Sequence, residues 1–183
     1  MALPVLMLTG PSGAGKSTLG CAVQQELANR GVISSVIDGD AVRALFANDL
    51  AHGSSGSQTN LERGVRMARS RLQIGEVPIL AFVSPDAALR ASARTMCEGF
   101  STELGRTVVF LEIYVAAPIE VCSARDVKGL YKKLATDPSC GVLLAGVNDK
   151  YDVPIAPALV CRTDETSIEK CTEMIVAATL AAM

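Results

Sequence analysis

The sequence predicts one α/β domain over residues 1–183, a three-layer sandwich with a mostly parallel, five-stranded sheet. Three observations lead to this prediction. Short apolar runs alternate with longer segments of helical periodicity along the chain. The apolar runs are almost continuous, as in strands that are covered on both faces. Polar motifs directly follow several of these runs, and in parallel sheets ligands bind beyond the carboxyl ends of the strands.

Composition excludes several classes of protein. The chain is 49% hydrophobic and 20% charged, and its net charge of −2 predicts no general attraction to nucleic acid or to anionic membranes. With 4% aromatic residues, stacking platforms for single-stranded nucleic acid are not expected. No apolar run approaches the ~18 residues of a membrane span, and the run at 3–8 lacks the basic leader of a signal peptide. The six scattered cysteines, without a C-x-x-C pair, are typical of reduced thiols in a cytoplasmic protein.

Residues 10–18, GPSGAGKST, match the phosphate-binding pattern G-x-x-x-x-G-K-[ST] at every position. The apolar run Leu3–Leu8 predicts a strand before this loop, and Lys16–Arg30 predicts a helix after it. Backbone N–H groups of the loop and the positive end of the helix dipole would surround the phosphates of ATP. Lys16 is expected to contact the β- and γ-phosphates, and the Ser17 hydroxyl is expected to bind Mg²⁺. The nucleotide-binding residues predicted in this loop are Gly10, Ser12, Gly13, Ala14, Gly15, Lys16, Ser17 and Thr18.

The second strand, Val32–Ile37, runs into Asp38-Gly39-Asp40. Two carboxylates beside a phosphate chain can orient Mg²⁺ and accept the proton of an attacking hydroxyl. An isolated motif of this kind is more often a polar turn with a helix-capping aspartate, so the catalytic interpretation depends on the preceding phosphate loop. Asp38 and Asp40 are therefore predicted to be catalytic with Lys16, and Asp40 to be a metal ligand with Ser17.

The middle of the chain contains a polar loop at 52–57 between two helices. His52, the only histidine, is either a proton shuttle or, as is commoner for a loop histidine, simply exposed. Thr59–Glu62 has the spacing of a capping box and predicts the start of the second helix. The other elements are expected to be a helix at 41–48, strands at 77–83 and 107–115, and helices at 87–104 and 118–125.

Residues 126–154 show no clear periodicity, and a long irregular stretch inside a compact domain is often an active-site lid. Residues 125–133 are basic, which indicates either a phosphate clamp or a solvated run of charge. A strand at 158–161 and a helix from Ser167 complete the predicted domain. We refer to residues 126–154 as the lid segment.

Four blocks of sequence resemble the adenylylsulfate (APS) kinase family: GPSGAGKST at 10–18, DGDAVR at 38–43, FVSP at 82–85 and IEVCSARDVKGLYKK at 119–133. Residues 145–154, AGVNDKYDVP, resemble the end of the lid in that family. Family members transfer the γ-phosphate of MgATP to the 3′-hydroxyl of APS, forming PAPS, and are homodimers with a mobile lid. The resemblance implies that this chain does the same, with ATP and Mg²⁺ as cofactors.

Matched by position, the resemblance implies that Asp40 is the base or Mg²⁺ partner, with Asp38 beside it, and that Arg125 contacts ATP. It also implies contacts to a nucleotide-like acceptor from Asp38, Asp40, Arg43, Asn60, Val83, Ser84, Lys128 and Gly129.

Four positions depart from the family pattern. His52 and Leu144 stand where the family has Phe, and Ser57 and Ala87 stand where it has Arg. All four positions address the acceptor in that family, whereas the ATP-binding positions of the pattern are intact. The alternative function is therefore phosphorylation of another nucleotide conjugate or small metabolite. A nucleotide-binding subunit without turnover is a third interpretation, against which Asp40 and Lys128 argue, because a pure binder needs no base.

Overall fold

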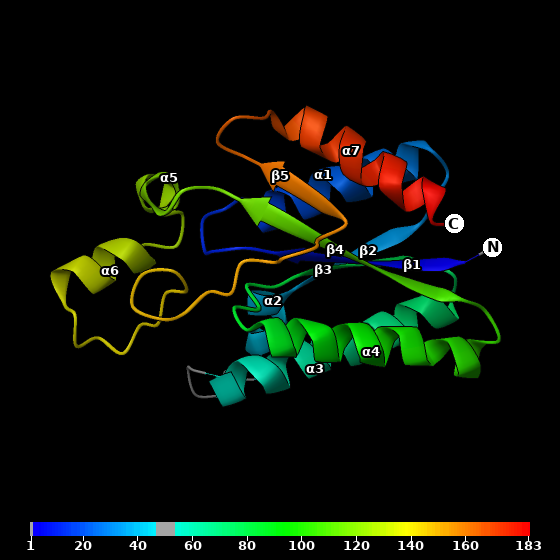
Figure 1. Ribbon diagram of the computed structural model, residues 1–183, viewed down its shortest axis with the longest axis horizontal. Helices are drawn as coiled ribbons and strands as arrows, with labels where there is room; N and C mark the ends of the chain where they lie inside the picture. The colour runs from blue at the N-terminus through cyan, green and yellow to red at the C-terminus, as the bar shows by residue number, and fades with distance from the viewer. Residues whose placement is uncertain (1, 47–53) are drawn as a thin grey trace.

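A five-stranded sheet forms the centre of the protein, which is described by a computed structural model for residues 2–46 and 54–183 (Figure 1). The strands lie in the order β2-β3-β1-β4-β5, and every pair of neighbours is parallel. Their bounds are Leu3–Thr9 for β1, Ser34–Asp38 for β2, Val77–Ala81 for β3, Val108–Ala116 for β4 and Leu159–Arg162 for β5. The predicted α/β sandwich with five strands is confirmed, and the sheet is parallel throughout.

Helices cover both faces of the sheet. In Figure 1, α1 and α7 lie on one face, α2, α3 and α4 lie on the other, and α5 and α6 project beyond the carboxyl ends of the strands. Their bounds are Lys16–Asn29 for α1, Gly39–Leu45 for α2, Ser54–Gln73 for α3, Ala87–Leu104 for α4, Ile119–Arg125 for α5, Leu130–Thr136 for α6 and Ile168–Ala181 for α7.

The central strand β1 feeds a hydrophobic core on each side of the sheet. All seven of its residues are buried. Leu6 and Leu8 pack into the cluster under α1 and α7, whereas Val5 and Met7 pack into the cluster under α3 and α4. This alternation follows from the period of two in a strand. Burial on both faces explains the unbroken apolar run in the sequence.

Two local predictions were wrong. Helix α3 begins at Ser54, not at the capping box near Thr59, so most of the predicted polar loop is helical. Serine and glycine are weak helix formers, so propensity does not predict a helix here, although Gly56 within it is buried. The helix predicted at 41–48 ends at Leu45. His52 and the end of that predicted helix lie outside the described residues.

The lid segment contains a helix that its sequence did not predict. Helix α6 begins after Gly129, whose φ of 66° is in the left-handed region. The carboxylate of Asp126 caps it, since Oδ1 accepts from the backbone N–H of Tyr131 at 3.1 Å and Oδ2 from that of Lys132 at 2.9 Å. The helix has only seven residues, too few for a clear hydrophobic period.

Candidate active site

The phosphate-binding loop connects β1 to α1, as its sequence predicts, and it requires glycine for steric reasons. A Cβ atom at Gly10 would lie 2.3 Å from the carbonyl oxygen of Val115. At Gly13, where φ is +81°, a Cβ would lie 2.7 Å from the carbonyl oxygen of Cys122. The loop is therefore pressed against β4 and α5 with no space for a side chain at these positions.

Lys16, the first residue of α1, folds back over the loop. Its Nζ donates to the carbonyl oxygens of Gly10 at 2.8 Å and Pro11 at 2.7 Å. Burial, together with a smaller contribution from repulsion by Lys128, lowers the pKa of Lys16 to about 8. A phosphate chain in the loop would raise this pKa again, because an opposite charge nearby favours the protonated amine.

Ser17 and Asp38 are held together beside the loop. The Ser17 hydroxyl donates to Asp38 Oδ2 at 2.6 Å, and Asp38 Oδ1 accepts from the backbone N–H of Asp40 at 2.9 Å, which caps α2. Thus the structure brings Asp38, rather than Asp40, to the predicted metal ligand Ser17. Among the described residues no cluster of three or more His, Cys, Asp or Glu side chains forms a metal site. A hydroxyl and one carboxylate still fit Mg²⁺, which prefers oxygen ligands and keeps water and phosphate oxygens as its other ligands.

Asp40 and Lys128 form an ion pair across the site, although 88 positions separate them in the chain. Asp40 lies in the first turn of α2, and Lys128 lies just before α6 in the lid segment. Both side chains remain accessible, with exposed fractions of 67% and 48%. Both also influence the charge of Lys16, so the two lysines and the carboxylate share one electrostatic site.

Two residues that sequence reasoning missed hold the back of the phosphate loop. Tyr131 of α6 donates through its hydroxyl to the Ser12 carbonyl oxygen at 2.8 Å. Thr163, directly after β5, donates through Oγ1 to the Ala14 carbonyl oxygen at 2.7 Å. Arg125 joins Thr163 to the loop, because its Nη2 donates to the Thr163 carbonyl oxygen at 2.7 Å and its Nη1 donates to the Gly13 carbonyl oxygen at 3.3 Å. Two features of the sequence could have indicated these residues. Tyr131 lies within a block that carries the family resemblance, and Thr163 follows the carboxyl end of a predicted strand.

Of the residues predicted to contact the acceptor, Asp38 ends β2 and Val83 and Ser84 follow β3, whereas Lys128 and Gly129 lie in the lid segment. Asn60 of α3 donates through Nδ2 to the Gly39 carbonyl oxygen at 2.8 Å. Its Oδ1 and the Ser84 hydroxyl are buried and have no hydrogen-bond partner among the described residues. Val83 accepts a hydrogen bond from Thr9 Oγ1 at 2.7 Å through its carbonyl oxygen. We call Asn60, Val83 and Ser84 the acceptor wall. Arg43 lies on α2, three residues after Asp40 and therefore on the same side of that helix.

The departures from the family pattern occupy different environments. Leu144 is 2% exposed and belongs to the core cluster under α1 and α7, so its side chain is not presented to a ligand. Ser57 is half-buried on α3, and Ala87 is exposed at the start of α4.

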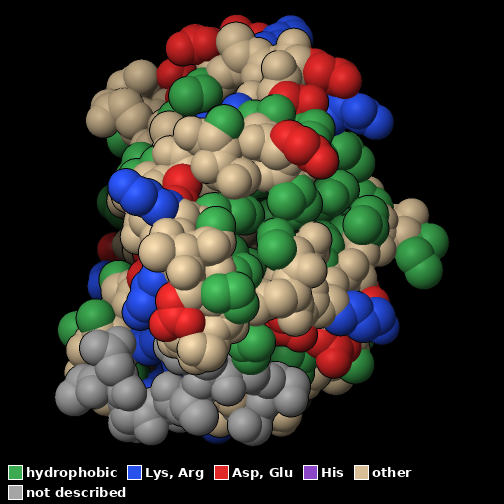
Figure 2. Space-filling view, turned by 90° about the vertical axis from the view of Figure 1, so that its left-hand side faces the viewer, with side chains coloured by type: hydrophobic (Ala, Val, Ile, Leu, Met, Phe, Trp, Pro, Cys, Tyr) green, Lys and Arg blue, Asp and Glu red, His purple; other side chains and the backbone are tan. Residues whose placement is uncertain are grey.

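The face at the carboxyl ends of the strands carries interspersed acidic and basic side chains (Figure 2). Attraction of phosphate there is consequently a local property of the loop.

A parallel sheet with a glycine-rich loop between β1 and α1, a lysine curled over that loop and carboxylates after β2 defines a P-loop phosphotransferase. The sequence model of the adenylylsulphate kinase family matches residues 3–162, and the chain belongs to this family. None of the described helices is long and apolar enough to cross a membrane.

The sequences and structures of relatives align with almost the whole chain. The adenylyl-sulfate kinase of Myxococcus xanthus is 39% identical over 90% of this chain and 84% of its own length. That of Synechococcus sp. (strain JA-3-3Ab) is 36% identical over 91% of this chain and 88% of its own. The structure of Mycobacterium tuberculosis APS kinase in complex with AMPPNP and APS matches with a TM-score of 0.84 at 28% identity, covering 97% of this chain and 96% of that one.

Proposed function

We propose that this protein transfers the γ-phosphoryl group of ATP to the 3′-hydroxyl of APS, with Mg²⁺ as the metal. The carrying observation is the juxtaposition of the Asp40–Lys128 pair with Lys16 at the mouth of an intact phosphate loop. Membership of the adenylylsulphate kinase family supports ATP as donor and APS as acceptor. A relative solved with AMPPNP and APS supports the same pair of ligands.

On the ATP side, loop N–H groups and the start of α1 bind the phosphates. Lys16 leaves the carbonyl oxygens of Gly10 and Pro11 for the more strongly accepting phosphate oxygens. Ser17 and Asp38 would hold Mg²⁺, which neutralises phosphate charge when it is bound. Tyr131, Thr163 and Arg125 keep the loop in place from behind.

On the acceptor side, Asp40 accepts the proton of the attacking hydroxyl, and Lys128 faces the charge that develops on the transferring phosphoryl group. In the ligand-free site these two groups neutralise each other. When the acceptor enters, the exposed pair can separate at little energetic cost, because such pairs are worth only ~0–1 kcal/mol. Positioning and charge stabilisation then supply most of the catalysis.

A different acceptor is the second candidate function. Buried Leu144 provides no aromatic surface for an adenine ring, and Ser57 and Ala87 provide no guanidinium group. Losing one stacking contact weakens binding by about 1–3 kcal/mol per base. If the acceptor has changed, it is another nucleotide conjugate or a small hydroxylated metabolite.

The proposal also covers the domain organisation, the oligomeric state and the location of the enzyme. Residues 1–183 act as one domain, as a homodimer, in the cytoplasm. The homodimer is what the family resemblance implies, and the six free cysteines fit a reducing compartment. Light scattering coupled to size exclusion measures the oligomeric state directly.

The deciding experiment is ADP release by the purified protein with MgATP, with and without APS. We expect release that depends on APS and that Lys16→Ala abolishes. ATP binding without an APS response would direct the search to other acceptors. Turnover that persists in Lys16→Ala would contradict the assignment of the site.

A further inference from the structure

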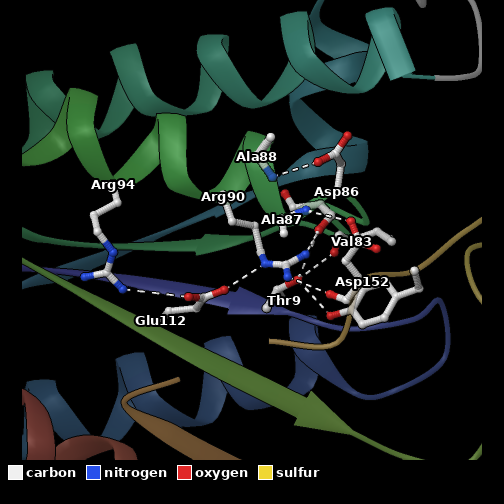
Figure 3. Close-up of polar contacts among 11 residues, drawn as sticks. Thr9, Val83, Asp86, Ala87, Ala88, Arg90, Arg94, Glu112 and Asp152 are labelled. Atoms are coloured by element: carbon white, nitrogen blue, oxygen red, sulfur yellow. Dashed lines mark hydrogen bonds and ion pairs between the residues drawn. The ribbon is translucent and has the colours of Figure 1, made fainter. Parts of the chain in front are cut away.

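A buried arginine lies behind the acceptor wall and joins three parts of the chain (Figure 3). Arg90 of α4 is only 3% exposed. Its Nε donates to Glu112 Oε1 on β4 at 2.7 Å, and its Nη1 donates to the Ser84 carbonyl oxygen at 2.7 Å. Its Nη2 donates to the carbonyl oxygen of Asp152, in the lid segment, at 2.6 Å. All three nitrogens of the guanidinium group therefore donate to buried or half-buried oxygen atoms.

The turn at Val83 and Ser84 needs this support. Ser84 has a φ of 41°, in the left-handed region that residues other than glycine rarely adopt. Such a conformation persists where the surroundings hold it. Arg90 holds the Ser84 carbonyl oxygen, and Thr9 donates to the Val83 carbonyl oxygen. The Thr9 hydroxyl also shares a hydrogen bond of 3.0 Å with the Tyr151 hydroxyl.

The end of the lid segment is fastened to the same turn. The Asp152 backbone N–H donates to the Pro85 carbonyl oxygen at 2.8 Å, and Asp152 Oδ2 accepts from the Ala87 N–H at 3.2 Å. The Arg90 guanidinium carbon lies 5.7 Å from the centroid of the Tyr151 ring. Thus the Arg90 side chain contacts both the acceptor wall and the carboxyl-terminal end of the lid segment.

We propose that Arg90 is a positioning residue for the acceptor, a role that rests on the proposed function. It fixes Val83 and Ser84 in the shape that the acceptor meets, and it ties the end of the lid segment to that shape. Arg125, Tyr131 and Thr163 supply the short hydrogen bonds that hold the phosphate loop. The loop meets the turn at Val83 only through a long hydrogen bond, from the Gly10 N–H to the Val83 carbonyl oxygen at 3.5 Å, so the ATP side should depend little on Arg90.

The test uses a variant that avoids burying a lone charge. Arg90→Met alone would leave the Glu112 carboxylate without its buried partner, so it is combined with Glu112→Leu. The matched control is Arg94→Met, because Arg94 lies one turn further along α4 and also approaches Glu112, at 3.7 Å. Arg94 contacts the Phe110 carbonyl oxygen, Glu98 and Glu112 rather than Ser84 or Asp152, and its side chain is 37% exposed. A circular dichroism melt shows that each variant is folded.

Steady-state kinetics give the first readout. In the double variant we expect the KM for APS to rise about 10- to 100-fold, since two charge-assisted hydrogen bonds to the turn and the lid segment are lost. The KM for ATP should stay within about twofold, as expected when the phosphate loop is untouched. Arg94→Met should resemble the wild type in both values. An unchanged KM for APS, an equal rise in both KM values, or the same rise in Arg94→Met would overturn the proposal.

Hydrogen exchange gives a readout that does not require turnover. The backbone N–H groups of residues 151–153 and of Ile155 should exchange faster in the double variant than in the wild type or in Arg94→Met, because the Asp152 anchor is weakened. If the wild type shows no turnover with APS, the proposed function fails. Faster exchange would then still support the anchoring role, and unchanged exchange would refute it.

Discussion

Replacing Asp40 by asparagine removes the carboxylate charge from the site while keeping the size of the side chain. The structure separates the effect on stability from the effect on activity. Asp40 is 67% exposed and its partner Lys128 is 48% exposed, so the pair contributes ~0–1 kcal/mol to the free energy of unfolding. For a chain of this length, 1 kcal/mol corresponds to about 2–4 °C in Tm. The melting temperature should therefore fall by about 4 °C at most.

Activity should fall much further. A positioned general base contributes ~10²–10⁴-fold to the rate, or about 2.7–5.4 kcal/mol of activation free energy. The assay is ADP release at saturating MgATP and APS, with the affinity for a non-hydrolysable ATP analogue measured alongside. That affinity should change little, since Asp40 is on the acceptor side of the site.

The control is Glu26→Gln, which removes an exposed ion pair with Arg30 on α1. It should lower Tm by a similarly small amount and leave kcat unchanged. Retention of more than about a tenth of kcat in Asp40→Asn would refute the general-base role. A large loss of Tm would instead refute the conclusion that the ion pair is energetically minor.

Three further predictions concern the phosphate loop. The Lys16 pKa is lowered to about 8 in the ligand-free protein, so ATP affinity should fall as pH rises from about 7 to 9 and the amine loses its charge; calorimetry should show that Lys16→Met removes this dependence. Gly13→Ala should abolish ATP binding while the far-ultraviolet dichroism stays native, because the new Cβ would clash with the Cys122 carbonyl oxygen; binding within about threefold of wild type would contradict the steric reasoning. Tyr131→Phe should raise the KM for ATP about 3- to 10-fold through the lost hydrogen bond to the Ser12 carbonyl oxygen, and an unchanged KM would show that α6 does not support the loop.

Features that depend on residues close together in the sequence could be predicted without the structure. The unbroken apolar run of β1 indicated a strand covered on both faces, and the spacing of Gly10, Gly13 and Gly15 indicated the loop that follows it. A helix-capping aspartate was the alternative interpretation of Asp38-Gly39-Asp40, and Asp38 does cap α2: its side chain accepts hydrogen bonds from the backbone N–H groups two and three residues later. Such interactions are local, so the residue pattern carries them directly.

Only the tertiary structure decided which distant groups meet. Tyr131 and Thr163 reach the phosphate loop from 119 and 149 positions away, and Arg90 joins Ser84 to Asp152 from a helix that no motif singled out. The burial of Leu144 likewise depends on the packing of the lid segment against the core. These contacts arise from the strand order and from the way loops converge at the carboxyl edge of the sheet, which no short window of sequence contains.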